Sequence, residues 1–403
     1  MKNKKARWVF DQPFSKKGWK KYINFPCNLR SMAKVTPWEV QGEIDYSRLM
    51  KEFGLQPFTN LPKRFLEQPL FRRGLVFAQR DFGRITEAIE NKKPFVMMTG
   101  LMPSGKFHFG HKMVADQMIF YQKLGAKIYL TVADIEAYNS RNPNMKELRE
   151  TAIQEYLTNY VALGLDLKKC DFYFQSKRSS DGEKASAYYS LANMLARHAT
   201  FNEFKAIYGE ISPGKMASAL LQAADMLHPQ LPEFEGKPLP IVVPVGSDQD
   251  AHVRLARDLS QRIKEFNFMQ LSSTYHKFLP GLKGGKMSSS DTNSYIALTD
   301  THEEAATKIK KYAFSGGQAT LEEHRKKGGN TDVDVAFQML RYGLEPDDKK
   351  LGKIYSDYRK GKLLSGELKQ ITIEKITVFL KEHQQKRKEA EKVVQKFIQA
   401  QGI

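Results

Sequence analysis

Short apolar runs alternate with longer amphipathic stretches through the middle of the 403-residue chain. Four of the runs have the length of buried strands, namely residues 95–98, 127–132, 171–175 and 241–245. Three stretches carry apolar residues at helical spacing, namely 81–91 (with Asp81 as its expected N-cap), 109–124 and 151–163. The alternation predicts an α/β domain around a mainly parallel sheet, in which ligands bind beyond the carboxyl ends of the strands.

The two ends of the chain follow other patterns. The first 75 residues are short aromatic and basic pieces interrupted by prolines, which predicts an irregular extension. After about Thr299 the strand patterns fade, and helical spacing dominates at 303–312, at 366–383 and on to 399. We therefore expect three parts, which cover residues 1–75, 76–300 and 301–403.

Composition narrows the class of protein. The hydrophobic share of 41% and the charged share of 27% are typical of globular chains. No apolar run approaches the roughly 18–20 residues of a membrane helix, and the N-terminus lacks the apolar core of a secretory signal. The two cysteines, Cys27 and Cys170, are too few for a disulfide framework or an all-cysteine zinc site. We therefore expect a cytoplasmic protein without a membrane anchor.

The net charge of +19 is concentrated in the two ends of the chain. Residues 1–100 carry +11, residues 101–300 carry +2 and residues 301–403 carry +6. Basic ends on a nearly neutral centre are typical of a protein whose flanks hold a polyanion while the centre acts on a small molecule. A Lys-rich surface that only keeps the chain soluble is the alternative.

A turn after the first predicted strand has the sequence Pro-Ser-Gly-Lys-Phe-His-Phe-Gly-His, residues 103–111. Its spacing excludes a Walker A loop and a G-x-G-x-x-G loop. A helix that begins here offers free backbone N–H groups and its positive dipole end to an anion. Gly110 lets a ligand approach the backbone, and His108 and His111 can donate hydrogen bonds to phosphate oxygens. Two histidines can also bind a metal, although no cysteine or acidic residue is close by in the sequence.

A second candidate loop follows the last predicted strand, with the sequence Gly-Gly-Lys-Met-Ser-Ser-Ser at residues 284–290. It is rich in N–H and hydroxyl donors, and Lys286 can place an ammonium group on a polyphosphate. A flexible surface linker is the alternative for such a stretch. Together, and in this order, the two loops resemble the two signature sequences of class I aminoacyl-tRNA synthetases.

The first loop is similar to the form shared by the tyrosyl and tryptophanyl enzymes, and nearly the whole chain resembles the tryptophanyl-tRNA synthetase family of the archaeal and eukaryotic type. Matching segments include 37–40, 200–202, 245–250, 313–317 and 328–335. The resemblance implies an α/β fold with a Rossmann-like parallel-sheet catalytic domain over 76–300, an all-helical tRNA anticodon-binding domain over 301–403 and a short N-terminal extension. A tyrosyl enzyme, a small-molecule nucleotidyltransferase and a non-catalytic RNA-binding paralogue are the alternatives.

The resemblance implies a two-step ligation of L-tryptophan to tRNA(Trp), in which ATP first forms tryptophanyl-adenylate and pyrophosphate. The implied catalytic residues are His108, His111 and Lys286, which stabilise phosphate charge in the transition state. The implied ATP-binding residues are Ser104, Gly110, Gly246, Asp248, Met287, Ser288 and Ser289. Mg²⁺ is implied as a bridge between ATP oxygens, so no protein metal site is expected. Basic clusters at 325–327, 349–350 and 386–388 are expected to contact the tRNA, and a homodimer is implied by the family alone.

Recognition of the amino acid departs from the eukaryotic pattern. Met98 and Thr131 stand where that pattern has a Tyr and a Gln that help to bind the indole. The segment from Gln222 to Asp225 instead resembles a helix of the bacterial tryptophanyl enzyme, in which the aspartate accepts the indole N–H, while Met98 can fill space beside the ring. Tyrosine stays open as the substrate, because tyrosyl enzymes also use an aspartate here. The implied partners of the substrate's α-amino group are Glu136, Gln222 and Gln249.

Overall fold

The computed structural model describes residues 45–59, 61–140, 144–285, 287 and 291–402, together with two short paired strands, β1 (Lys34–Val35) and β2 (Val40–Gln41). Its centre is a seven-stranded sheet in the order β3-β4-β9-β8-β5-β6-β7. The strands are β3 (Gln56–Pro57), β4 (Val76–Arg80), β5 (Val96–Leu101), β6 (Lys127–Val132), β7 (Cys170–Phe174), β8 (Ile241–Gly246) and β9 (Ser272–His276). The neighbours from β9 to β7 pair in parallel, whereas β4 is antiparallel to both β9 and β3.

The five parallel strands follow the order of a doubly wound fold. The chain runs outward from β5 through β6 to β7 and then returns to the other side of β5 with β8 and β9. The direction therefore reverses between β5 and β8, where Val96 lies opposite Ile241. Ligands of such sheets bind at this reversal, outside the carboxyl ends of the strands. The predicted Rossmann-like α/β class is confirmed.

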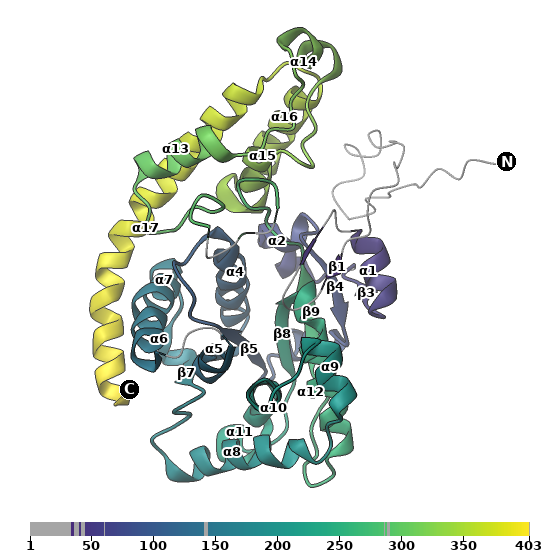
Figure 1. The fold of residues 1–403 in the computed structure, drawn as a ribbon, viewed down its shortest axis with the longest axis vertical. Helices are drawn as coiled ribbons and strands as arrows, with labels where there is room; N and C mark the ends of the chain where they lie inside the picture. The colour runs from purple at the N-terminus through teal and green to yellow at the C-terminus, as the bar shows by residue number, and fades with distance from the viewer. Residues whose placement is uncertain are drawn as a thin grey trace, which may run out of the picture.

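Helices cover both faces of the sheet, as Figure 1 shows. On one face lie α4 (Phe109–Lys123) and the continuous segment α6 (Met145–Thr151), η2 (Ala152–Leu157) and α7 (Thr158–Leu163). On the other face lie α8 (Gly182–Ala196), α9 (Phe201–Tyr208), α10 (Pro213–Leu227), α11 (Pro232–Glu235) and α12 (Asp250–Arg262). Met97 and Met98 belong to different buried clusters, because successive residues of a strand point to opposite faces.

Short elements complete the α/β part. They are α1 (Tyr46–Glu52), η1 (Lys63–Glu67), α2 (Pro69–Arg72), α3 (Gly83–Glu90), α5 (Asp134–Ser140), η3 (Leu167–Lys169), η4 (His228–Gln230) and η5 (Ser247–Gln249). The prediction that Asp81 caps a helix is wrong. Asp81 has a φ of 52°, α3 begins after Phe82 without a side-chain cap, and the Asp81 carboxylate forms an ion pair with Arg257. The Asp81 side chain therefore takes part in a long-range ion pair and not in a local helix cap.

All four predicted strands are confirmed as β5, β6, β7 and β8, each within a few residues of the expected range. The sequence pattern missed β4 and β9. The sequence of β9, Ser-Ser-Thr-Tyr-His, reads as a polar loop, yet all five residues are buried between β4 and β8. Three of its hydroxyl groups are accommodated by hydrogen bonds, from Ser272 Oγ to the Asp81 carbonyl at 2.6 Å, from Ser273 Oγ to the Tyr275 hydroxyl at 3.0 Å and from Tyr275 to Asp250 at 2.6 Å.

The remainder of the chain is helical, as predicted. Its elements are α13 (His302–Tyr312), α14 (Leu321–Lys327), α15 (Val335–Met339), η6 (Leu340–Leu344), α16 (Asp348–Arg359) and α17 (Ser365–Gln401). The last is a single 37-residue helix that runs back along α7 (Figure 1). Two contacts tie it to the α/β part, because His383 Nε2 lies 2.7 Å from Asn159 Oδ1 and Arg387 donates to the Gln154 carbonyl. None of the described helices is long and apolar enough to cross a membrane.

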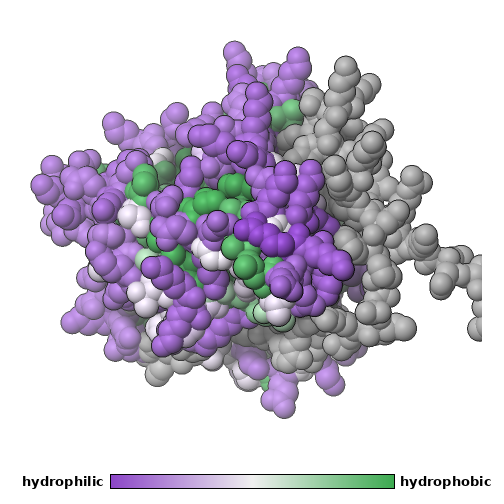
Figure 2. Space-filling view, turned by 90° about the horizontal axis from the view of Figure 1, so that it is seen from above, coloured by the Kyte–Doolittle hydropathy of each residue, from purple (hydrophilic) through white to green (hydrophobic). Residues whose placement is uncertain are grey.

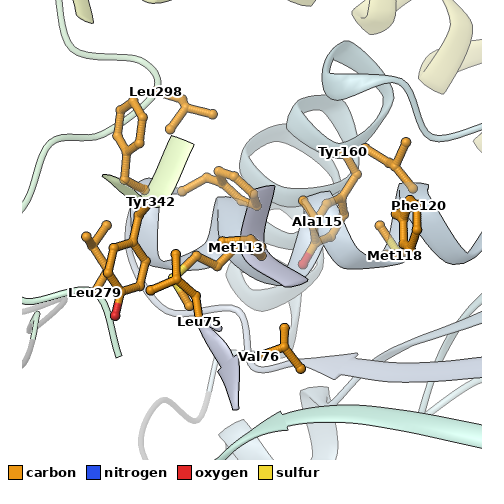
Figure 3. Close-up of a cluster of buried hydrophobic side chains, with 14 of the residues drawn as sticks. Leu75, Val76, Met113, Ala115, Met118, Phe120, Tyr160, Leu279, Leu298 and Tyr342 are labelled. Carbon is orange, nitrogen blue, oxygen red and sulfur yellow. The ribbon is translucent and has the colours of Figure 1, made fainter. Parts of the chain in front are cut away.

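One buried cluster joins these parts. Figure 3 shows Leu75 beside Met113 of α4, with Leu279 and Tyr342 next to each other on the same side of the cluster. The buried Arg73 adds polar contacts across the same junction. Its guanidinium donates to the carbonyls of Arg341 and Glu345, each at 2.6 Å, and to Asp348. The helices of the C-terminal part therefore pack directly against the sheet domain. The domain boundaries at 75/76 and 300/301 stay a prediction.

Candidate active site

The start of α4 places the two predicted histidines side by side. The backbone N–H of Gly110 donates to His108 Nδ1 at 3.1 Å, and the backbone N–H of His108 donates to His111 Nδ1 at 3.2 Å. The two rings stack with their centroids 3.8 Å apart. Because each Nδ1 accepts a hydrogen bond, each neutral ring carries its proton on Nε2, from which it can be donated to a ligand.

Burial keeps both rings uncharged. Desolvation lowers the pKa of His108 to about 4, and desolvation together with the neighbouring His108 lowers the pKa of His111 well below its usual range. At neutral pH the pair therefore presents two neutral N–H donors. Such donors can bind a phosphate oxygen without placing two like charges in contact when the ligand is absent.

Gly110 brings the two predicted loops together. A Cβ at this position would lie 2.9 Å from His108 Cε1 and 3.3 Å from Met287 Sδ, so only glycine fits between the histidine ring and the second loop. Lys286, Ser288 and Ser289 lie outside the residues that the structure describes. The base of their loop is closed by an ion pair of 2.7 Å between Lys283 and Asp291.

Ser104 lies in the turn that precedes the histidines. The Tyr156 hydroxyl donates to the Ser104 carbonyl at 3.0 Å, and the Tyr156 ring lies 5.1 Å from that of His111. Tyr295 packs on the other histidine, with its ring centroid 5.0 Å from that of His108. These aromatic residues support the turn from both sides.

The carboxyl end of β8 holds a second group of predicted residues. A Cβ on Gly246 would lie 2.6 Å from Asp248 Oδ1 and 2.8 Å from the Phe278 ring, so the missing side chain lets the carboxylate fold against the strand. Asp248 is buried, with 8% of it exposed, and Gln249 is half-buried at the start of α12. Tyr46 of α1 also lies here, and its pKa is raised to about 12 by burial and by the charge of Asp248.

Asp225 of α10 is the centre of a third group. Its Oδ1 accepts hydrogen bonds from the Tyr173 hydroxyl at 2.7 Å and the Tyr188 hydroxyl at 2.8 Å, and its Oδ2 accepts one from Gln175 Nε2 at 2.8 Å. Burial raises the pKa of Asp225 to about 6, against the lowering effect of these donors. A carboxylate has about four lone-pair positions, so one remains beside the three bonds. Met98 of β5 is buried in the same cluster of side chains.

Two of the three residues predicted to bind the α-amino group, Glu136 and Gln222, adjoin this third group, whereas Gln249 lies with Asp248 after β8. Gln222 is one turn before Asp225 on α10, and its Oε1 is buried without a hydrogen-bond partner among the described residues. Glu136 lies in the first turn of α5, after β6, and its backbone N–H donates to Gln175 Oε1 at 3.4 Å. An unpartnered buried acceptor is costly unless a donor reaches it, so Gln222 favours a ligand with N–H groups.

All three groups lie at the carboxyl side of the parallel strands. Ser104 follows β5, Glu136 follows β6, Gln175 follows β7 and Gly246 ends β8. Among the described residues, no cluster of three or more histidine, cysteine or acidic side chains could hold a metal. The arrangement thus offers neutral and backbone donors for an anion, together with a buried carboxylate, Asp225, that can accept a further hydrogen bond beside aromatic side chains.

Sequence reasoning missed several members of the site, namely Tyr46, Tyr173, Gln175, Tyr188 and Tyr295. One signal was available. Tyr173 and Gln175 are two residues apart at the end of a strand, so both point to the same face, toward the helix that carries Asp225. The others come from distant elements, and nothing in the sequence connects them to the two loops.

Comparison with family models matches residues 90–399 to the class I tRNA synthetases for tryptophan and tyrosine. The chain belongs to this synthetase family. Among its members, the tryptophan–tRNA ligase of Methanocaldococcus jannaschii is 43% identical over 91% of this chain and 99% of its own length. That of Aeropyrum pernix is 44% identical over 91% of this chain and 98% of its own length.

Solved structures of the family agree with the fold. The crystal structure of the Aeropyrum pernix tryptophanyl-tRNA synthetase has a TM-score of 0.81 and covers 87% of this chain and 95% of its own. The Plasmodium falciparum tryptophanyl-tRNA synthetase, at 32% identity, has a TM-score of 0.76 over 87% of this chain and 95% of its own. The resemblance to the archaeal type of tryptophanyl synthetase is therefore confirmed.

Proposed function

We propose that this chain ligates L-tryptophan to tRNA(Trp) in two steps, with ATP as the second substrate and with tryptophanyl-adenylate as the intermediate. The observation that carries the proposal is the stacked pair of neutral histidines at the start of α4, packed through Gly110 against Met287 of the second loop. The relatives named tryptophan–tRNA ligase support the choice of amino acid. The products are AMP, pyrophosphate and the aminoacylated tRNA.

The first step joins the tryptophan carboxylate to the α-phosphate and expels pyrophosphate. Positioning and charge stabilisation are sufficient for this chemistry, so no protein nucleophile is needed. His108 and His111 donate from Nε2 to the phosphate oxygens as negative charge accumulates. Lys286, with Ser288 and Ser289, holds the departing pyrophosphate. Mg²⁺ would enter with ATP and supply charge neutralisation at its phosphate oxygens.

The rest of the nucleotide binds at the turn before α4 and at the group around Asp248, and the amino acid binds at the group around Asp225. Gly110 and Ser104 contact the base and the phosphates beside α4. Gly246 and Asp248 contact the ribose, whose hydroxyl groups can donate hydrogen bonds to the buried carboxylate. The α-amino group takes its acceptors from Glu136, Gln222 and Gln249. The orphaned Gln222 Oε1 supports this role, because a substrate ammonium would satisfy it.

Asp225 accepts the indole N–H through the lone-pair position that its three donors leave. Tyr173, Tyr188 and Gln175 hold the carboxylate in place for this bond. Met98 packs beside the ring, where its flexible thioether can follow the indole outline. A phenol would donate to the same carboxylate, so the shape of the pocket also contributes to the choice between tryptophan and tyrosine.

The helical part over 301–403 binds the anticodon region of the tRNA, next to the catalytic domain over 76–300 and the extension over 1–75. Figure 2 views this end of the molecule, where hydrophilic side chains cover most of the face and surround a smaller hydrophobic area. The net charge of +6 over residues 301–403 favours contact with the phosphate backbone of the tRNA. We further propose that the enzyme acts in the cytoplasm as a homodimer, as the family resemblance implies.

The test is ATP–pyrophosphate exchange with each amino acid in turn. We expect exchange that depends on tryptophan, with tyrosine at background. Equal exchange with tyrosine would assign the chain to the other specificity, and no exchange with either would reject the proposal. Lys286→Ala should lower the exchange rate far more than it weakens tryptophan binding, because the lysine acts only as phosphate charge accumulates. An equal loss in both quantities contradicts its assignment.

A further inference from the structure

A cavity of about 260 Å³ opens at the edge of the sheet where strands β6 and β7 begin. Lys127 and Cys170, the first residues of β6 and β7, lie in its wall, together with Phe397 near the end of α17. It therefore lies at the amino ends of the strands. Its wall reaches the third group of the candidate site through Arg178, because the guanidinium lies 4.0 Å from the centroid of the Tyr173 ring, whose hydroxyl donates to Asp225.

The wall of this cavity is strongly basic. It contains five cationic side chains and one acidic one, namely Lys127, Lys168, Lys177, Arg178, Lys184 and Asp171. Three of the cations have partners, because Lys127 pairs with Glu235, Lys177 donates to the Gly402 carbonyl and Arg178 pairs with Asp171. Lys168 and Lys184 have no carboxylate at ion-pair distance within the described part of the chain. The cavity thus retains uncompensated positive charge.

Arg178 gives the cavity a fixed donor group. It is 4% exposed, and its guanidinium lies 4.0 Å from the centroid of the Tyr173 ring and 4.6 Å from that of Phe234. Its Nε donates to His228 Nε2 at 2.9 Å, and its two Nη atoms donate to Asp171 at 3.1 and 2.8 Å. An arginine has five N–H groups, so two remain beyond these three bonds. Packing and these hydrogen bonds hold the side chain in one orientation, as in a preorganised anion-binding site.

We propose that this cavity binds a phosphate group at the amino ends of the parallel strands. Lys168 and Lys184 supply the unpaired cations, and Arg178 adds a guanidinium held in one place. The volume is slightly below that of pockets that enclose drug-sized ligands, and it is sufficient for a phosphate or pyrophosphate. The phosphate belongs either to a free oligophosphate or to the backbone of an RNA. The inference rests on the cavity alone and does not depend on the proposed function.

The test compares pyrophosphate binding, measured by isothermal titration calorimetry at low salt, in the full chain and in two double variants. The first variant, Lys168→Gln with Lys184→Gln, removes the two unpaired cations from the cavity. The second, Lys146→Gln with Lys205→Gln, removes the same charge from exposed positions on α6 and α9. We expect the full chain and the control variant to bind pyrophosphate at the cavity with similar affinity. The Lys168/Lys184 variant should bind it there about tenfold or more weakly, because two charge-assisted hydrogen bonds are lost.

The reaction centre can bind pyrophosphate as well, and that class of sites should persist in all three proteins. Identical titrations of the full chain and the Lys168/Lys184 variant would overturn the proposal, as would an equal weakening in both variants. A short RNA duplex added to the full chain distinguishes the two sources of phosphate. Displacement of pyrophosphate from the cavity by the duplex assigns the site to an RNA backbone, and retention of pyrophosphate assigns it to a free oligophosphate.

Discussion

Replacement of Gly110 by alanine tests the contact on which the candidate active site depends. The new methyl group would lie 2.9 Å from His108 Cε1 and 3.0 Å from His108 Nδ1, closer than side-chain atoms normally approach. The ring of His108 must therefore move, and with it the hydrogen bond from the Gly110 N–H to Nδ1. Met287 Sδ, at 3.3 Å, limits movement on the other side.

Stability and activity should respond differently to Gly110→Ala. Alanine favours a helix over glycine by about 1 kcal/mol, which offsets a loss of about 1 kcal/mol from the disturbed hydrogen bond at the start of α4. The free energy of unfolding should thus change by less than about 1 kcal/mol. The rate of tryptophan-dependent ATP–pyrophosphate exchange should fall by about 10²–10³-fold, as when one preorganised donor to a developing charge is lost.

Gly366→Ala provides the matched control. Gly366 is the second residue of α17, as Gly110 is of α4, and a Cβ there would meet no atom within 4 Å. This variant should keep the exchange rate and gain a little stability. Urea unfolding gives the stability and initial-rate exchange gives the activity. A Gly110→Ala protein that exchanges as fast as the control would refute the claim that the glycine sets the position of His108.

Three further variants test other parts of the structure. His111→Asn should lower the exchange rate about a hundredfold with little change in the KM for tryptophan, and a change confined to KM would contradict a role in the transition state. The pKa of Asp225 is raised to about 6, so its carboxylate is ionised above pH 6 and takes up a proton as the pH falls through 6. The KM for tryptophan, measured from pH 5 to pH 8, should therefore rise below pH 6 in the natural chain and stay flat in Asp225→Asn, whereas parallel profiles would remove Asp225 from the indole site. Arg73→Ala leaves the carbonyl groups of Arg341 and Glu345 without this donor, while Asp348 keeps its ion pair with Arg72, and should lower the free energy of unfolding by about 3 kcal/mol in urea. A change below about 0.5 kcal/mol would show that the junction is held by apolar packing alone.

The local parts of this protein could be read from its sequence. Strands β5, β6 and β8 are apolar runs, and α4 follows a turn whose histidines cap it within four residues. The contacts that define such elements lie close together in the chain, so the pattern of residues is sufficient to predict them. The same holds for His108, Gly110 and His111, whose hydrogen bonds are all made within one helical turn.

Long-range contacts decided the rest. The polar strand β9 is buried only because β4 and β8 flank it, and the Asp81 carboxylate, which was expected to cap a helix, instead pairs with Arg257, 176 residues away. The same is true of Asp225, whose three donors come from β7, from the residue that follows it and from α8, and of Gly110, whose Cβ position would also meet Met287. Side chains from distant segments meet only when the sheet has assembled, so no local pattern contains the information that the tertiary structure supplies.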